Sequence, residues 1–373
     1  MAGIYLHVPF CKQKCSYCDF HFSTSMKLKK DMVKAMVAEL EMHANEWENE
    51  LIETVYFGGG TPSILDGGEL KELLEAVKKN YRVLEKAEVT IEANPDDIDP
   101  FALKEWKSIG INRLSIGLQS FQSDQLVWMN RAHTAEESLK CIPLAQEHGF
   151  DNISVDLIYG LPGMSLKSWE EQLKIIASLN VQHLSCYILT VEEKTLLHKQ
   201  VTNKEKIIPH DELISAQYTL LCKWAKVHGF EHYEVSNFAQ EGKRSEHNGN
   251  YWKRKAYLGI GPSAHGFKGK QRNWNIANNP RYIKQLQNGE PAFDFEQLTE
   301  RDVVNEEIMV GLRKKEGIDP KLILRESKKE QDEINASLAR FTEKGWLKIT
   351  PEAITMTESG WLMSDAVSAE LFS

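Results

Sequence analysis

Six short apolar segments alternate with helical segments through the first two-thirds of the chain, and this alternation constrains the fold more than any other feature. The apolar segments are Ile4–Val8, Thr54–Phe57, Val89–Ala93, Arg113–Leu118, Ile153–Tyr159 and His183–Leu189. Nearly continuous apolar runs of this length are typical of parallel strands that are covered on both faces. Strands that are each followed by a helix predict a parallel sheet with helices outside it. Because six repeats run without a clear reversal point, we expect an incomplete (β/α)6 barrel, in preference to a doubly wound sheet.

Helical spacing of apolar residues defines the segments between the strands, as in Met32, Met36 and Leu40. The expected helices cover Ser25–Trp47, Leu70–Val77, Phe101–Ile109, Asp124–Met129, Ala135–His148, Ser168–Leu179 and Glu212–Val227, and Tyr233–Val235 is expected to be one more short strand. Glycine and polar residues collect where strands end, as in Gly58–Gly60 and Gly160–Gly163. Strand ends form the active face of such barrels, so we expect the functional site there.

The periodicity weakens after the barrel-like part. Residues 239–280 are rich in Gly, Asn, Trp, His and Lys, and a loop of this length is usually functional. A helical, charged segment follows and ends in a small hairpin, as in a winged-helix module. We therefore expect a barrel over residues 1–238, a loop or linker over 239–280, and a mainly helical, winged-helix-like domain over 281–373.

Charge and length limit the classes of partner and compartment. The chain has 373 residues and a net charge of −9, and residues 296–373 alone carry 11 Lys/Arg against 16 Asp/Glu. These values argue against nucleic-acid binding, including binding by the C-terminal module. The N-terminus does not resemble a secretory signal, and no apolar run reaches about 18 residues. We expect a cytoplasmic protein whose contact with membrane proteins is at most transient.

Cys11, Cys15 and Cys18 form a C-x3-C-x2-C cluster directly after the first strand. In a reducing cytoplasm, clustered cysteines are metal ligands more often than disulfides. Three thiolates on one loop suit an iron–sulfur cluster with one open iron. Two alternatives stay open from the spacing alone: zinc with His7 or His21 as fourth ligand, and a chance grouping of thiols. Cys141, Cys186 and Cys222 stand singly and are expected to be buried structural residues.

Six ordered motifs point to a known family. They are YLHVPFCKQKCSYCDF, YFGGGTPS, IEANPD, RLSIGLQSF, MNRAHT and DLIYGLPG. The cysteine motif after the first strand resembles the radical S-adenosylmethionine (SAM) superfamily. All six motifs together resemble the oxygen-independent coproporphyrinogen III oxidase group, and the resemblance covers nearly the whole chain. It implies a radical-SAM barrel in which Cys11, Cys15 and Cys18 hold a 4Fe-4S cluster.

The resemblance also implies a set of SAM-binding residues. They are Tyr5, Tyr17, Gly59, Gly60, Thr61, Glu92, Gln119, Arg131 and Asp156. The residue types suit this ligand, because glycine lets the backbone approach closely, a carboxylate suits a ribose diol, and arginine suits a carboxylate. Asp156 lies inside an apolar strand and therefore needs a polar partner.

Two departures separate this chain from the oxidases themselves. The oxidase motif has another cysteine two residues after the third ligand, where this chain has Phe20. The oxidases also carry a long N-terminal extension, whereas only Met1-Ala2-Gly3 precede the first strand here. Both features resemble the HemW-type heme chaperones. His247, in the sequence HNGNYW, resembles their heme-binding signature, and His265 is a weaker second candidate.

The resemblance to HemW-type proteins implies a heme chaperone that passes heme to apo-proteins of the respiratory chain. A single axial histidine in an accessible loop would suit reversible binding. The alternative is an oxygen-independent coproporphyrinogen III oxidase of heme biosynthesis. Whether SAM is cleaved stays open, since a transfer role needs no radical chemistry.

Overall fold

The structure is a computed structural model that describes residues 1–372. Its centre is a twelve-stranded sheet in the order β12-β11-β10-β9-β1-β2-β3-β4-β5-β6-β8-β7. The six central strands are parallel and follow chain order: β1 (Ala2–Val8), β2 (Leu51–Gly59), β3 (Arg82–Ala93), β4 (Arg113–Gln119), β5 (Ile153–Tyr159) and β6 (His183–Ile188). The predicted series of six parallel strands is therefore present, in the predicted order.

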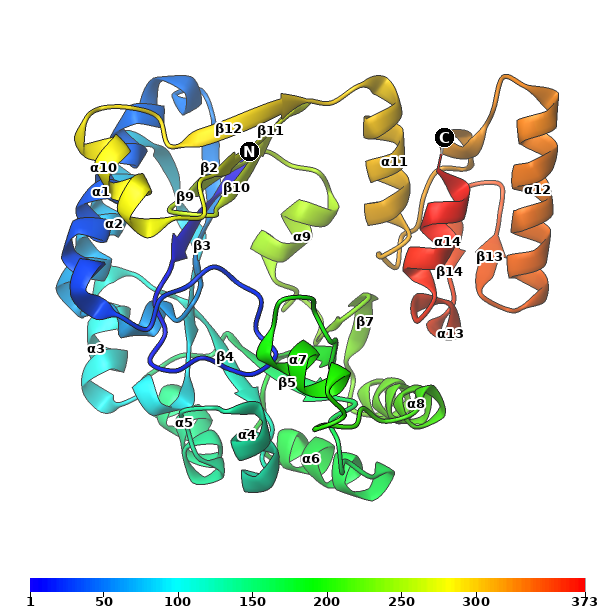
Figure 1. The fold of residues 1–373 in the computed structure, drawn as a ribbon, viewed down its shortest axis with the longest axis horizontal. Helices are drawn as coiled ribbons and strands as arrows, with labels where there is room; N and C mark the ends of the chain where they lie inside the picture. The colour runs from blue at the N-terminus through cyan, green and yellow to red at the C-terminus, as the bar shows by residue number, and fades with distance from the viewer. Residues whose placement is uncertain (373) are drawn as a thin grey trace.

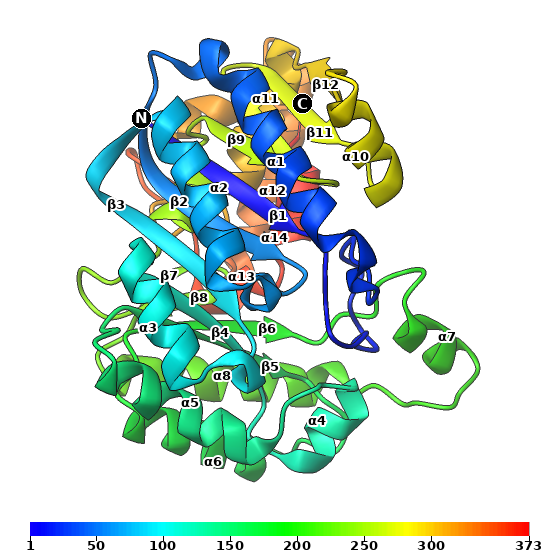
Figure 2. The same cartoon turned by 90° about the vertical axis from the view of Figure 1, so that its left-hand side faces the viewer.

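Helices cover the outer face of these strands in an arc (Figure 1). They are α1 (Lys29–His43), α2 (Gly67–Asn80), α3 (Pro100–Ile109), α4 (Ser123–Met129), α5 (Ala135–Glu147), α6 (Leu166–Ser178) and α8 (Asp211–Val227). Helix α7 (Leu196–Thr202) projects away from this layer (Figure 2). Local sequence starts several of them: Asp66 and Glu69 form a capping box at α2, which satisfies two backbone donors. Buried apolar side chains on α2, among them Leu73 and Val77, then fix the helix against the sheet.

The sheet continues beyond β1 and β6, and this continuation corrects the loop expected at residues 239–280. The added elements are β7 (Glu231–Glu234), β8 (Asn237–Ala239), α9 (Glu246–Trp252), β9 (Tyr257–Ile260), β10 (His265–Lys268), β11 (Gln271–Asn275) and β12 (Phe293–Gln297). β9 pairs in parallel with β1, from Gly3 opposite Tyr257 to Leu6 opposite Ile260. The stretch is ordered because β9 pairs with β1, and β10, β11 and β12 are added to β9 in turn.

The C-terminal lobe stands to one side of the barrel (Figure 1) and has its own apolar core. It contains α11 (Glu300–Gly311), α12 (Lys328–Glu343), β13 (Leu347–Ile349), β14 (Ile354–Met356), α13 (Glu358–Trp361) and α14 (Ser364–Leu371). Short 3-10 turns lie at Met26–Leu28, Ala44–Trp47, Pro62–Ile64, Pro95–Asp97 and Pro320–Ile323. The expected boundary at residue 281 is displaced, because α10 (Asn279–Gln287) buries Tyr282 and Leu286 in the core of the barrel.

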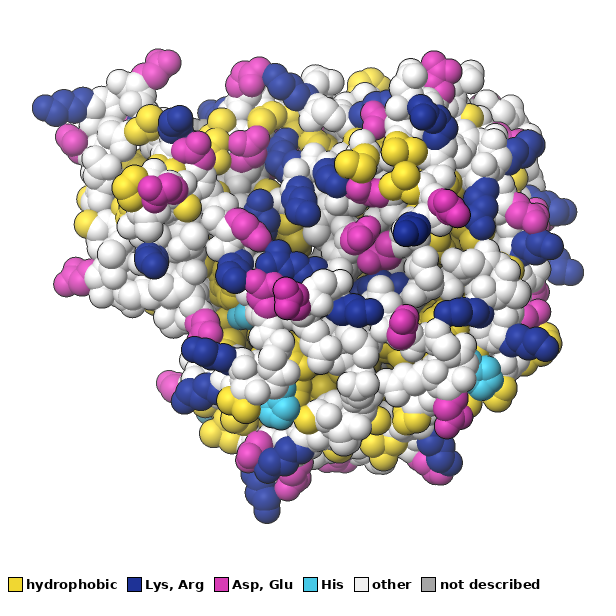
Figure 3. All heavy atoms as spheres, turned by 180° about the vertical axis from the view of Figure 1, so that it is seen from behind, with side chains coloured by type: hydrophobic (Ala, Val, Ile, Leu, Met, Phe, Trp, Pro, Cys, Tyr) yellow, Lys and Arg dark blue, Asp and Glu magenta, His cyan; other side chains and the backbone are white. Residues whose placement is uncertain are grey.

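Direct contacts join the lobe to the barrel. The His232 ring meets the Trp361 ring edge-on at 4.0 Å, and the Val235 N–H donates to the carbonyl of Arg313 over 3.0 Å. Acidic and basic side chains are mixed over the face behind Figure 1 (Figure 3). None of the helices within residues 1–372 is both long and apolar enough to cross a bilayer.

Candidate functional site

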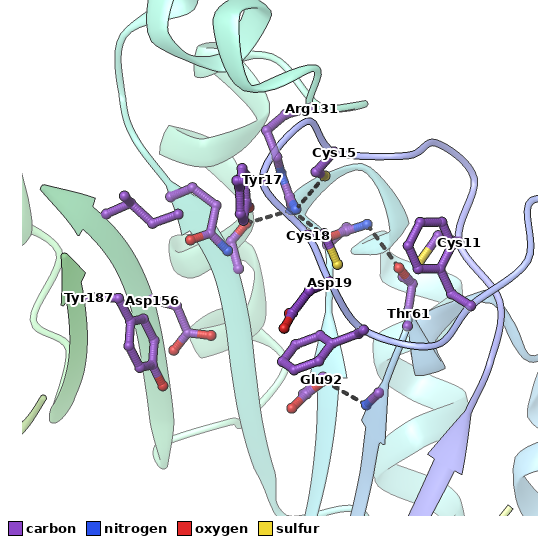
Figure 4. A pocket seen from close by; sticks show the side chains of 18 of the residues that line it. Cys11, Cys15, Tyr17, Cys18, Asp19, Thr61, Glu92, Arg131, Asp156 and Tyr187 are labelled. Carbon is purple, nitrogen blue, oxygen red and sulfur yellow. Dashed lines mark hydrogen bonds between the residues drawn. The ribbon is translucent and has the colours of Figure 1, made fainter. Parts of the chain in front are cut away.

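The cysteine loop leaves β1 at the carboxyl end of the barrel and closes on itself. The Cys11 N–H donates to the carbonyl of Ser23, and the Ser23 N–H donates back to the carbonyl of Pro9. Between these bonds, Cys11, Cys15 and Cys18 all line one cavity of about 400 Å³ (Figure 4). All three are free thiols. The spacing therefore brings three sulfur atoms to one space.

Helix α7 lies beside this loop, whereas strands β7 and β8 lie far from it (Figure 2). The Leu197 N–H at the start of α7 donates to the carbonyl of Ser16 over 2.8 Å. Helix α7 was missed by the sequence analysis, although Thr195 caps its first turn. The connection after β6 therefore steadies the loop that carries the cysteines.

The glycine segment after β2 supports the start of the cysteine loop. The Gly60 N–H donates to the carbonyl of Val8, and the Thr61 N–H donates to that of Phe10. A Cβ on Gly60 would lie 2.5 Å from the carbonyl oxygen of Phe10, so only glycine permits this approach. Gly59 has φ +106°, which L side chains rarely adopt. The N–H groups of Gly60 and Thr61 are therefore already hydrogen-bonded to the protein backbone. The segment positions the cysteine loop as well as lining the cavity.

Arg131 connects the cysteine loop to the strand ends. Its Nη1 donates to Cys15 Sγ at 3.4 Å, and its Nη2 donates to Asn94 Oδ1 at 2.6 Å and to the carbonyl of Gly117 at 3.0 Å. Its buried Nε has no partner. A guanidinium that lines a cavity is suited to an anionic ligand group.

Two buried carboxyl groups face the same cavity. Glu92 accepts from the Tyr56 hydroxyl at 2.9 Å and from the Gly59 N–H at 3.2 Å, and burial raises its pKa to about 8. Burial also raises the pKa of Asp156 to about 6, and one oxygen of Asp156 has no partner. Unpartnered buried polar atoms are costly unless a ligand or water completes them.

The donor set fits a cluster and SAM. Burial raises the pKa of Cys11 to about 11 and that of Cys18 to about 12, so metal binding there would release protons. Gln119 lines the cavity with φ +61°, a strained backbone of the kind found at ligand sites. Arg131, Asp156 and Gln119 line this cavity, so its walls carry polar side chains of the kinds that a ligand such as SAM needs.

The structure brings most of the predicted site residues to this one cavity. Its lining includes Cys11, Cys15, Cys18, Tyr17, Gly59, Gly60, Thr61, Glu92, Gln119, Arg131 and Asp156. Sequence analysis missed Asn94, Tyr187 and Phe22, which also line it. Asn94 and Tyr187 lie at strand ends, and that position was the signal available for them.

Tyr5 and His247 lie elsewhere, in a second and smaller chamber inside the barrel. This inner chamber has a volume of about 180 Å³ and is lined by polar side chains of the strands and of α9. Tyr5 does not line the cysteine cavity, which corrects the expected grouping. Its position three residues before the end of β1 places it deeper in the barrel than the loop.

His247 is not in an accessible loop, which corrects the expected setting of this histidine. It lies on α9, and its side chain is only 3% exposed. Its Nδ1 is 2.7 Å from the Thr54 hydroxyl and its Nε2 is 2.8 Å from the Tyr251 hydroxyl. Burial lowers its pKa to about 3. With both nitrogens hydrogen-bonded, this imidazole does not fit heme iron in the conformation described here.

The histidines considered for zinc are also occupied. His7 accepts from the Tyr5 hydroxyl through Nδ1 and donates to the carbonyl of His21 through Nε2. His21 bonds the Asn279 side chain at 2.7 Å. Within residues 1–372, no three His, Cys, Asp or Glu side chains converge closely enough to hold a single metal ion. The same holds for Cys11, Cys15 and Cys18, which share a cavity without converging on one point.

Comparisons with known proteins agree with the fold. A sequence model of the radical SAM superfamily matches residues 5–176, and one of the HemN C-terminal domain matches residues 298–363. A solved structure, coproporphyrinogen III oxidase (HemN) from Escherichia coli, is similar to this chain with a TM-score of 0.85 at 22% identity, covering 100% of this chain and 90% of that one. The expected radical-SAM α/β fold with a helical C-terminal part is confirmed.

Two relatives align over nearly their whole length. The chain is 34% identical over 372 residues to the heme chaperone HemW of Bacillus subtilis (strain 168), and the alignment covers 98% of both. It is 34% identical over 370 residues to the heme chaperone HemW of Mycobacterium tuberculosis (strain ATCC 25618 / H37Rv), with 98% of this chain and 93% of the relative covered.

Proposed function

The chain belongs to the HemW family within the radical SAM superfamily, and from this premise we propose that it is a heme chaperone. It binds a 4Fe-4S cluster, SAM and heme, and it delivers heme to apo heme proteins of the respiratory chain. The observation that carries the proposal is the 34% identity to B. subtilis HemW over 98% of both chains. The chaperone acts in the cytoplasm, and its contact with membrane-bound acceptors is transient.

Cys11, Cys15 and Cys18 hold the cluster in this proposal. Three thiolate ligands leave one iron open to the amine and carboxylate of SAM. Arg131 and Gln119 bind polar groups of SAM, Asp156 and Glu92 bind its hydroxyl or amine groups, and Gly59, Gly60, Thr61 and Tyr17 line its site. The cavity that all these residues line supports this assignment. Tyr5 lies deeper in the barrel and supports the site indirectly, through the hydrogen bond between its hydroxyl and His7.

His247 is the heme ligand that the family signature supports. Iron can reach its Nε2 only after the hydrogen bond to Tyr251 has opened and α9 has moved from the barrel. The role of His247 therefore belongs to an open form of the protein.

A transfer experiment tests the proposed function. The reconstituted chain is loaded with heme under anaerobic conditions and mixed with a large excess of an apo b-type cytochrome. We expect the absorption spectrum of the carrier to be replaced by that of the cytochrome, faster than free heme of the same concentration produces it. Heme that stays on the carrier, or a rate equal to that of free heme, would contradict a delivery role.

The oxidase alternative has its own test. Its support is the fold alone, through the similarity to the E. coli enzyme. The reconstituted chain is incubated anaerobically with SAM, reductant and coproporphyrinogen III. Protoporphyrinogen as product would replace the chaperone proposal, whereas unchanged substrate together with heme transfer supports it.

A further inference from the structure

Asn130 lies on the corner after α4 and holds the middle of the cysteine loop. Its Nδ2 donates to the carbonyl of Lys14 at 2.7 Å, and its Oδ1 accepts from Nε2 of Gln13 at 2.7 Å. The same Nε2 of Gln13 also donates to the carbonyl of Asn130 at 3.1 Å. One asparagine therefore binds two consecutive residues that lie 116 and 117 positions earlier in the chain.

The two neighbours of Asn130 hold the same part of the loop. The Ser16 N–H donates to the carbonyl of Met129 over 3.0 Å, and Nη1 of Arg131 donates to Cys15 Sγ at 3.4 Å (Figure 4). Three consecutive residues of this corner thus fix Cys15 through its chain neighbours as well as through its sulfur.

The backbone of the corner does not by itself require an amide side chain. Asn130 has φ +58°, in the left-handed region that glycine and asparagine adopt most readily. The Arg131 N–H donates to the carbonyl of Leu126 over 2.9 Å, which ends α4 in a Schellman motif. Glycine would serve this helix end equally well. The two side-chain hydrogen bonds to the cysteine loop are what glycine could not supply.

The position of Cys15 matters for the spacing of all three thiols. A 4Fe-4S cluster needs its thiolates at fixed separations, because each of them binds a different iron. The Cys18 N–H donates to the carbonyl of Cys15 at 3.4 Å, so the position of the third cysteine depends on that of the second. A residue that fixes Cys15 therefore also helps to set the distances between the sulfur atoms.

We propose that Asn130 is a positioning residue for the iron–sulfur cluster. It holds Gln13 and Lys14, and it thereby keeps Cys15 at the separation from the other thiols that the cluster needs. Asn130 does not line the cysteine cavity, so it acts only through the loop. The inference rests on the cluster of the proposed function, and it adds a residue that touches neither the cluster nor SAM.

Release of iron from the anaerobically reconstituted full-length chain to a ferrous-iron chelator tests this role. Asn130→Gly removes the amide but keeps a residue that adopts the left-handed backbone, so the chain without cofactors should unfold in urea as the wild type does. We expect this variant to release iron about tenfold faster. Asn180→Gly is the matched control, because Asn180 also has a left-handed backbone, with φ +48°, and lies in the turn before β6. It should release iron at the wild-type rate.

Gln13→Ala approaches the same contact from the loop. It removes the partner of Asn130 Oδ1 but keeps the hydrogen bond between Asn130 and the carbonyl of Lys14. We therefore expect a smaller increase in the rate of iron release than in Asn130→Gly.

The EPR spectrum of the dithionite-reduced cluster separates a positioning role from a purely structural one. Without the two hydrogen bonds the Cys15 sulfur takes more than one position, so the signal should broaden in Asn130→Gly and not in Asn180→Gly. Equal iron release in these two variants, or faster release with an unchanged EPR signal, would overturn the inference and leave the cluster assignment in place. A wild-type chain that takes up no cluster would contradict the proposed function, and this inference with it.

Discussion

The cysteine cavity and the inner chamber are built by the same parallel strands, but they differ in what their side chains leave free. The cavity at the strand ends holds three free thiols and unpartnered atoms of Arg131 and Asp156. The inner chamber also holds unpartnered atoms, on Arg113, Asn237 and the shared Asp156, but it holds no thiol, and its His247 is paired with Thr54 and Tyr251. The three thiols of the loop at the strand ends, rather than unpartnered polar atoms, therefore distinguish the two regions.

The largest expected effect comes from removing a thiol of the cavity. Cys15→Ala leaves two cysteines on the loop, too few to retain the cluster, so iron and sulfide should fall to background in the reconstituted protein. Cys141→Ala is the matched control, because Cys141 is a buried thiol on α5, away from the cavity. It should keep full iron content. Wild-type iron in the Cys15 variant would show that the loop is not the cluster site.

Two buried arginines offer the next comparison, since Arg131 lines the cavity and Arg113 lines only the inner chamber. Arg131→Met removes charged hydrogen bonds of up to about 3 kcal/mol, so SAM affinity should fall roughly hundredfold. Arg113→Met should lower the free energy of unfolding but change SAM affinity less than about threefold. Calorimetric titration with SAM measures both. Equal losses of SAM affinity would mean that the two regions act as one site.

Glu92 lines both regions and gives a pH-dependent comparison. Burial raises its pKa from 4.5 to about 8, so the folded state holds a proton that the unfolded state releases. The contribution of this proton to the free energy of unfolding is complete below about pH 4.5. It is lost as the pH rises to about 8, at up to about 1.4 kcal/mol per pH unit. Without cofactors, Glu92→Gln should flatten this fall in urea unfolding at pH 5, 6.5 and 8. Equal slopes in wild type and variant would contradict the prediction.

The smallest effect is expected inside the chamber. Tyr251→Phe removes one hydrogen bond of His247 and should lower the free energy of unfolding by about 1 kcal/mol. It should also raise the rate of heme binding to the open form, because the hydrogen bond that holds Nε2 of His247 no longer has to break. Tyr257→Phe is the control, because the Tyr257 hydroxyl makes no hydrogen bond within residues 1–372. Identical stability in the two variants would show that the contact with Tyr251 contributes nothing.

Strands with unbroken apolar runs could be predicted from the sequence, and strands at the sheet edge could not. The predicted strand Ile153–Tyr159 has the same first and last residues as β5, because a strand buried on both faces needs apolar residues throughout. β9 is four residues long and owes its order to pairing with β1, some 250 positions earlier, which no local pattern reveals. For α9 a signal was present: Ser245 caps the helix by accepting from the Asn248 N–H.

The sequence by itself determined that three thiols share one loop, because the eight residues from Cys11 to Cys18 must stay close together in any fold. It also determined the order of the parallel strands, since each apolar run is followed by a helix that returns the chain to the same end. Only the tertiary structure decided which histidine is open. His247 is closed by Thr54 and Tyr251, whereas His265 faces a groove assembled by β10, β11 and α10. Burial is a property of such distant contacts, so the residue type and its neighbours in sequence could not reveal it.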